Sequence, residues 1–233
     1  MSIRTPAMSR LLAHRFTSTS LSVRQFSHSA PALSHIGRKV LTFPKEVAIE
    51  HDTTPITNPR IPSELNNTTL TVSGPLGKHS MPIKPFVNLN ITPGQADGED
   101  SELSVNVVDP TIKEQRSMWG TTRALINNII IGVTEGYKVP IRLVGVGYRA
   151  TLEDNDRKLS LKLGYSHPVE MILPEGVTCS IPQPNRLVLQ GSDLQEVKEL
   201  AAKIQRWRKP EPYNQKGIFI GDETIKKKEG KKK

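Results

Sequence analysis

The 233-residue sequence has one cysteine, few aromatic residues and no long apolar run. With Cys179 alone, the chain cannot form an intrachain disulfide or a metal site built on several thiolates. The best candidate for a membrane span, residues 129–133, is far shorter than the roughly 18 apolar residues that a span needs. Aromatic residues make up 5% of the chain and are scattered, which disfavours base-by-base reading of single-stranded RNA on an aromatic sheet.

Acidic residues are absent from the start of the chain, and the first is Glu46. Residues 1–30 carry four arginines, residues 31–199 have a net charge of −2, and residues 200–233 have a net charge of +7. The total of +9 therefore comes from the two ends. A basic excess of this kind predicts a polyanionic partner, either nucleic acid or an anionic membrane surface.

The N-terminal segment has the composition of a mitochondrial transit peptide. It spaces its four arginines among ten Ser and Thr residues without an acid, a composition typical of transit peptides, and it lacks the apolar run of a secretory signal. We expect a transit peptide over residues 1–26, with cleavage just after Phe26. The alternative is a disordered basic tail that stays on the mature protein.

The body of the chain predicts an α+β fold of two tandem similar domains. Each half has strands first and one main helix last, which indicates a mostly antiparallel sheet packed against a helix. We expect domains over residues 34–136 and 137–209, and an extended basic tail over 210–233. Three prolines predict a loop insertion at residues 51–66.

Capping-box spacing places the two helix starts at Thr111 and Ser192, followed three residues later by Glu114 and Gln195. The expected apolar face of the first helix follows Met118, Thr122, Leu125, Ile129 and Val133, widened by Ile126 and Ile130.

No catalytic constellation emerges from the motifs. Residues 145–150, Gly-Val-Gly-Tyr-Arg-Ala, match a dinucleotide-binding fingerprint, but a strand and not a helix is expected next, so a matrix NAD-dependent oxidoreductase is only a distant alternative. Cys179 lies at an alternating position of an apolar strand and should be buried. His167 lacks the partners of a nucleophile–base pair, and the six histidines lack metal-ligand spacing. We expect no cofactor, metal or small-molecule substrate.

Several motifs together resemble one family. The helix sequence GTTRALINN at residues 120–128, the strand sequence LVGVGYRA at 143–150 and the loop sequence LGYSHPV at 163–169 are similar to those of bacterial-type ribosomal protein L6 of the large subunit. PEPY at 210–213, KGI at 216–218 and KEGKKK at 228–233 resemble its C-terminal signature. The resemblance runs from about residue 35 to the end in family order.

The resemblance implies two tandem α+β domains and a structural, non-catalytic place in the large subunit, near the sarcin–ricin loop and the translation-factor site. With the leader, it implies the mitochondrial matrix, large-subunit rRNA and neighbouring mitochondrial ribosomal proteins as partners, and translation factors nearby. An RNA-binding maturation factor for the same RNA is the alternative. Implied rRNA contacts are carried over by position: Arg208, Lys209, Tyr213, Lys216, Gly217, Lys226, Lys227 and Lys228, and more weakly Arg149 and the 164–168 loop with His167.

This sequence departs from the family pattern within that signature. Asn214 and Phe219 stand where the pattern usually has basic residues, and Gln215 stands where it often has glycine. We therefore expect a weaker RNA contact at this turn, or one supplemented by protein neighbours.

Overall fold

The computed structural model describes residues 35–56, 66–94, 100–153 and 157–231. The predicted transit peptide and most of the predicted 51–66 loop lie outside these residues and stay predictions. The start of that loop is corrected, because His51 and Asp52 are the last residues of a strand, β2.

The chain has an α+β fold whose sheets are all antiparallel in the described residues. Its buried apolar side chains form two separate cores, one from residues 41–133 and one from residues 141–218. We call them the first and the second core. Two cores, each with its own sheets and a main helix, agree with the predicted pair of similar domains.

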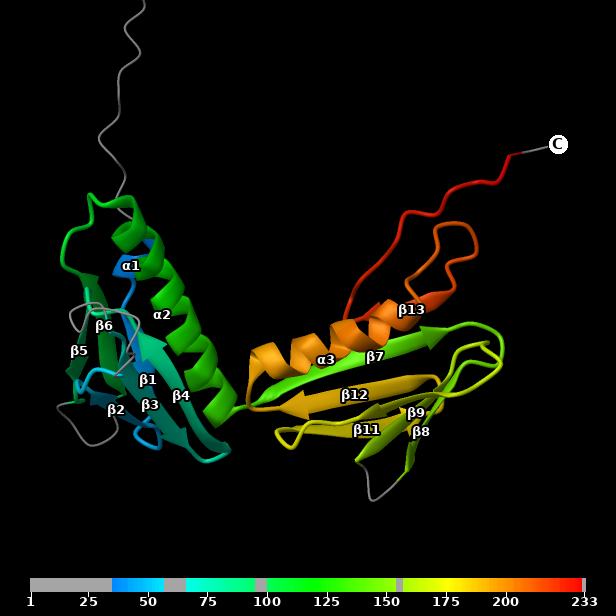
Figure 1. The fold of residues 1–233 in the computed structure, drawn as a ribbon, viewed down its shortest axis with the longest axis horizontal. Coiled ribbons are helices and arrows are strands. Elements are labelled where there is room, and N and C mark those ends of the chain that lie inside the picture. The colour runs from blue at the N-terminus through cyan, green and yellow to red at the C-terminus, as the bar shows by residue number, and fades with distance from the viewer. Residues whose placement is uncertain (1–34, 57–65, 95–99, 154–156, 232–233) are drawn as a thin grey trace, which may run out of the picture. The chain divides into compact units, whose positions relative to one another are not determined.

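The first core lies between α2 and two three-stranded sheets, β1-β6-β5 and β2-β3-β4 (Figure 1). Its elements are α1 (His35–Arg38), β1 (Leu41–Phe43), β2 (Ala48–Asp52), β3 (Thr68–Gly74), β4 (Gly77–Ile83), β5 (Val87–Thr92), β6 (Ser101–Val107) and α2 (Lys113–Thr134).

Alternation along the strands builds the first core, since every second residue points to the same face of a sheet. In β3 this buries Leu70 and Val72, and in β6 it buries Leu103 and Val105. Each fully buried side chain of this size contributes about 1.5–3 kcal/mol.

The helix α2 packs on this surface with a face slightly rotated from the predicted one. Its buried residues are Trp119, Thr122, Ile126, Ile130, Gly132 and Val133. The predicted Leu125 and Ile129 lie only half-buried beside the core. The indole N–H of Trp119 donates to the backbone oxygen of Val105 at 2.6 Å. Trp119 was not among the residues of the predicted face.

Both predicted capping boxes are wrong in detail. Thr111 does not cap α2, because its amide and hydroxyl both donate to the Asp109 carboxylate, at 2.9 and 2.6 Å. The helix begins after Ile112, which offers no side-chain cap. The cap of α3 is Asp193 and not Ser192, and its carboxylate accepts from the amide of Gln195 at 2.8 Å. In both places an aspartate, a stronger acceptor, lies within two residues of the hydroxyl residue.

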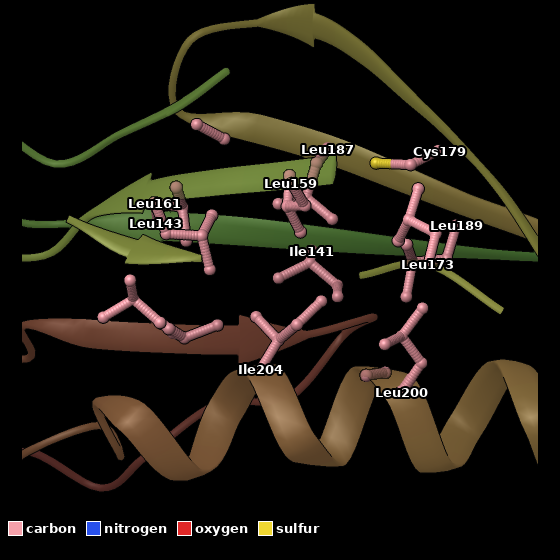
Figure 2. Close-up of a cluster of buried hydrophobic side chains, with 14 of the residues drawn as sticks. Ile141, Leu143, Leu159, Leu161, Leu173, Cys179, Leu187, Leu189, Leu200 and Ile204 are labelled. Carbon is pink, nitrogen blue, oxygen red and sulfur yellow. The ribbon is translucent and has the colours of Figure 1, made fainter. Parts of the chain in front are cut away.

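The second core lies between α3 and a four-stranded sheet, β11-β12-β7-β13, and includes a three-stranded sheet, β10-β9-β8. Its elements are β7 (Tyr137–Val144), β8 (Arg149–Glu153), β9 (Lys158–Lys162), β10 (Val169–Ile172), β11 (Val177–Gln183), β12 (Arg186–Gly191), α3 (Leu194–Trp207) and β13 (Gly217–Ile220). Figure 2 shows Leu200 and Ile204 of α3 pointing toward Ile141 and Leu189 of the strands. Cys179 is buried in β11, as predicted.

The last strand, β13, lies where the sequence predicted an extended tail. It pairs antiparallel with β7, with Ile218 opposite Leu143 and Ile220 opposite Ile141. Ile218 and Phe219 are buried. Residues 217–220 are therefore part of the sheet, and the segment from 208 to 217 is a loop with both ends attached to the second core.

The glycines of residues 145–150 serve a turn and not a nucleotide. Gly147 has φ 74°, and the chain passes directly from β7 into the strand β8. A dinucleotide fingerprint needs a helix at this point, so that interpretation is wrong. Within the described ranges, no helix is long and apolar enough to cross a membrane, and no group of three or more His, Cys, Asp or Glu could hold a metal ion.

Candidate nucleic-acid interface

The loop between α3 and β13 is closed by backbone hydrogen bonds across its base. The amide of Ile218 donates to the oxygen of Arg208, and the amide of Glu211 donates to the oxygen of Lys216, both at 2.9 Å. We call residues 208–217 the arm loop. Both of its ends are thereby held, and its exposed residues Lys209, Tyr213 and Lys216 project from a fixed base.

Gly217 shapes the arm loop from inside. It is buried, has φ 146°, and a Cβ placed there would come within 2.5 Å of the Pro210 Cα. Only a residue without a side chain lets the two strands of the loop approach so closely. Gly217 remains a predicted RNA contact, but its burial assigns it this packing role first.

The basic tail runs back along the arm loop up to residue 228. The side-chain Nε2 of Gln215 donates to the backbone oxygen of Ile225 at 3.1 Å, and the amide of Lys228 donates to the oxygen of Pro212 at 3.0 Å. Lys226, Lys227 and Lys228 are exposed. Residues 226–228 of the predicted extended tail therefore lie beside the loop that carries Lys216.

A glutamate fixes the turn from which the tail leaves the sheet. One carboxylate oxygen of Glu223 accepts from the side-chain amide of Gln205 on α3 at 2.6 Å. The same oxygen lies 3.5 Å from the amide of Ile220 at the end of β13. The tail thus starts from a position tied to both the helix and the strand.

Aromatic and basic side chains that are scattered in the sequence meet beside the arm loop. Arg208 lies over the ring of Tyr165, with the guanidinium carbon 5.8 Å from the ring centroid. The Tyr165 hydroxyl donates to the backbone oxygen of Trp207 at 2.6 Å, and the Tyr165 and His167 rings are stacked, with centroids 6.3 Å apart. The predicted residues Arg208 and His167 are therefore both in contact with Tyr165, a residue of the predicted 164–168 loop.

The charge of Arg208 is further stabilised by its surroundings. Its pKa is raised above the usual value for arginine, first by the side-chain hydrogen bond with Tyr165 and then by the electrostatic interaction with Tyr148. Because arginine is always protonated in proteins, the consequence is orientation and not a change of charge. Cation–π contact and hydrogen bonding hold a guanidinium that can still donate to a phosphate.

Arg149, another predicted rRNA contact, lies at the start of β8. It faces Lys162 of β9 across the ladder, and both side chains are exposed. Directly opposed residues of an antiparallel pair point to the same face, and like charges there repel each other. An anion bound between them would relieve that repulsion.

Comparison with known proteins decides the family. The profile of the ribosomal protein L6 family matches residues 144–220, from the last residue of β7 to the last residue of β13. The large ribosomal subunit protein uL6m of Neurospora crassa is 40% identical over 222 residues, which cover 89% of this chain and 83% of the relative. The chain belongs to the ribosomal protein L6 family. This family identifies a ribosomal protein and not an enzyme.

Bacterial members of the L6 family match over nearly their whole length. The uL6 protein of Zymomonas mobilis is 40% identical over 201 residues, which cover 86% of this chain and 100% of the relative. That of Listeria welshimeri is 39% identical over 200 residues, covering 85% of this chain and 98% of the relative. The resemblance inferred from the sequence motifs is thereby confirmed.

Two departures from the L6 pattern have a structural explanation. Phe219 is buried in β13, and the Arg142 guanidinium lies over its ring at 5.7 Å from the centroid, so the residue contributes packing where the family pattern is usually basic. Gln215 has φ 55°, a conformation that glycine adopts without cost. A glycine would therefore suit this backbone better, and the glutamine must be explained by its side chain.

Proposed function

We propose that this chain is a structural, non-catalytic constituent of the mitochondrial large ribosomal subunit, which binds and braces large-subunit rRNA near the sarcin–ricin loop and the translation-factor site. The compartment is the mitochondrion, the partner is large-subunit rRNA, and the binding surface is the arm loop with the basic tail. Neighbouring ribosomal proteins would contact other parts of the molecule, and translation factors would pass nearby.

The observation that carries the proposal is the gathering of cations along the arm loop. Lys209, Lys216 and the three lysines 226–228 lie on one hydrogen-bonded unit at the end of the second core, beside Arg208. Lysine and arginine form charge-assisted hydrogen bonds with phosphate, and such contacts position a protein on RNA. Because the base of the loop is fixed, little ordering is needed when RNA binds.

The compartment is supported by two independent features. Residues 1–30 have the arginine-rich, acid-free composition of a transit peptide. The relative uL6m of Neurospora crassa is the mitochondrial member of the family. Sequencing the mature N-terminus tests this part, with Ser27 as the expected first residue. A mature protein that starts at Met1 or Ser2 would contradict cleavage.

Gradient sedimentation of an organelle lysate tests the structural role. We expect the protein to travel with the large subunit and to stay there under moderate salt washing. Loss from mature subunits in that wash, with retention on lighter precursor particles, would instead identify an RNA-binding maturation factor.

A further inference from the structure

Gln215 is the only non-glycine residue with a positive φ among the described positions, at 55°. Residues with a Cβ enter this left-handed region rarely, and asparagine, aspartate and glycine are the usual occupants. The backbone alone gives no reason for a glutamine there. A favourable interaction of its side chain is therefore needed to explain the residue.

That interaction joins two segments of opposite direction. The Gln215 side chain donates to the oxygen of Ile225 at 3.1 Å, ten residues further along. The amide of Lys228 donates to the oxygen of Pro212 at 3.0 Å. These two hydrogen bonds flank the exposed residues Lys226 and Lys227, so they fix one of the two lysine runs of the tail.

Electrostatics oppose this arrangement in the free protein. Lys216 and the lysines 226–228 carry the same charge, and like charges repel each other over several ångströms even in water. A lysine-rich segment without attachment would extend into solvent. The attachment therefore holds the lysine run 226–228 beside the loop that carries Lys216, and a bound polyanion would offset the repulsion between them.

We propose that Gln215 is a positioning residue that fastens the basic tail to the arm loop, so that Lys216 and Lys226–Lys228 meet RNA phosphates as one surface. The inference rests on the proposed function, because it concerns how the same RNA is held. It also explains why a residue with a side chain occupies this positive φ, since glycine at position 215 could not reach the tail.

Two substitutions separate the side chain from the backbone. Gln215→Met keeps the length of the side chain and removes its donor. Gln215→Gly removes the donor and also relieves the positive φ. We expect both to speed hydrogen exchange of the residue-228 amide and to weaken binding of a transcript of the sarcin–ricin domain about two- to tenfold, the ratio that corresponds to one net hydrogen bond. A merely structural Gln215 predicts instead that Gln215→Gly binds RNA as well as the unaltered chain.

The control is the full chain with Lys226→Ala, Lys227→Ala and Lys228→Ala. In this background Gln215→Met should still speed exchange at residue 228, but it should no longer change RNA affinity, because the attached segment has lost its charge. Equal affinity losses in both backgrounds would overturn the inference, and so would an unchanged exchange rate at residue 228. If the unaltered chain does not bind the transcript at all, the proposed function fails, and the exchange measurement still judges the attachment.

Discussion

Replacing Ile218 by alanine tests whether the C-terminal segment completes the second core. Ile218 is 0% exposed and lies opposite Leu143 in the ladder between β13 and β7. The same substitution at Ile172 of β10, which is 82% exposed, is the matched control. Both positions are isoleucines on strands beside the second core, Ile218 in the four-stranded sheet and Ile172 in the three-stranded sheet, and they differ mainly in burial.

The magnitude follows from that burial. Removing the side chain beyond Cβ from a fully buried isoleucine costs about 2–5 kcal/mol, because transfer energy and a cavity both contribute. We expect about 3 kcal/mol at Ile218, which is roughly a 150-fold change in the unfolding constant, at about 1.4 kcal/mol per tenfold. At Ile172 we expect less than about 0.5 kcal/mol, as for other surface substitutions.

Urea unfolding followed by circular dichroism measures both effects. With a slope of about 2 kcal/mol per molar urea, Ile218→Ala should lower the midpoint of the transition of the second core by about 1.5 M. The midpoint of Ile172→Ala should stay within about 0.3 M of the unaltered chain on the same slope. Equal shifts for the two variants would refute the assignment of residues 217–220 to the sheet.

Three further predictions concern single side chains. Tyr165→Phe removes the hydroxyl that donates to the backbone at the end of α3. In thermal melts it should lower the free energy of unfolding by about 0.5–1 kcal/mol, and it should weaken RNA binding. Tyr213→Phe should leave the free energy of unfolding unchanged. Lys216→Ala should flatten the salt dependence of RNA binding by about one unit of slope, and Lys78→Ala, an exposed lysine of β4, should leave the slope unchanged if it is a valid control. The pKa of Asp109 is lowered by hydrogen bonds from Thr111, so its stabilisation is present above the unfolded pKa of about 4 and is lost as pH falls through the lowered folded value. Asp109→Asn should therefore be less stable than the unaltered chain at pH 6, and the difference should shrink as the pH falls through the lowered folded pKa; a difference that stays constant with pH would contradict this.

The sequence predicted the strands whose apolar residues alternate between polar neighbours. Their pattern predicts strands at residues 86–91, 103–108, 169–172 and 177–181. The third of these matches β10, and the others differ from β5, β6 and β11 only at their ends. The missed strands carry contrary signals. β4 is polar and contains Pro82, and β13 is four residues long between prolines and lysines. These strands form by pairing with β3 and β7, and such pairing cannot be predicted from the local sequence.

Contacts between distant parts of the chain also limit what the sequence could predict of the candidate site. The basic residues of the arm loop stand together in the sequence, so their motif could identify them. Tyr165 reaches Trp207 across 42 positions, and the attachment of Gln215 depends on a reversal of the chain after β13. Both contacts exist only after the second core has formed. The sequence therefore predicted the basic residues, but not the contacts of Tyr165 and Gln215 that orient them.

The position of β13 makes the proposed RNA binding dependent on completing the chain. The arm loop has one end on α3 and the other on a strand that pairs with β7, more than 70 residues earlier in the chain. A protein shortened before Gly217, by incomplete synthesis or by proteolysis, would lack both the edge of its sheet and the base of the loop. Such a fragment could not form the base of the arm loop, so it would lose the proposed RNA contact together with the strand that finishes the fold.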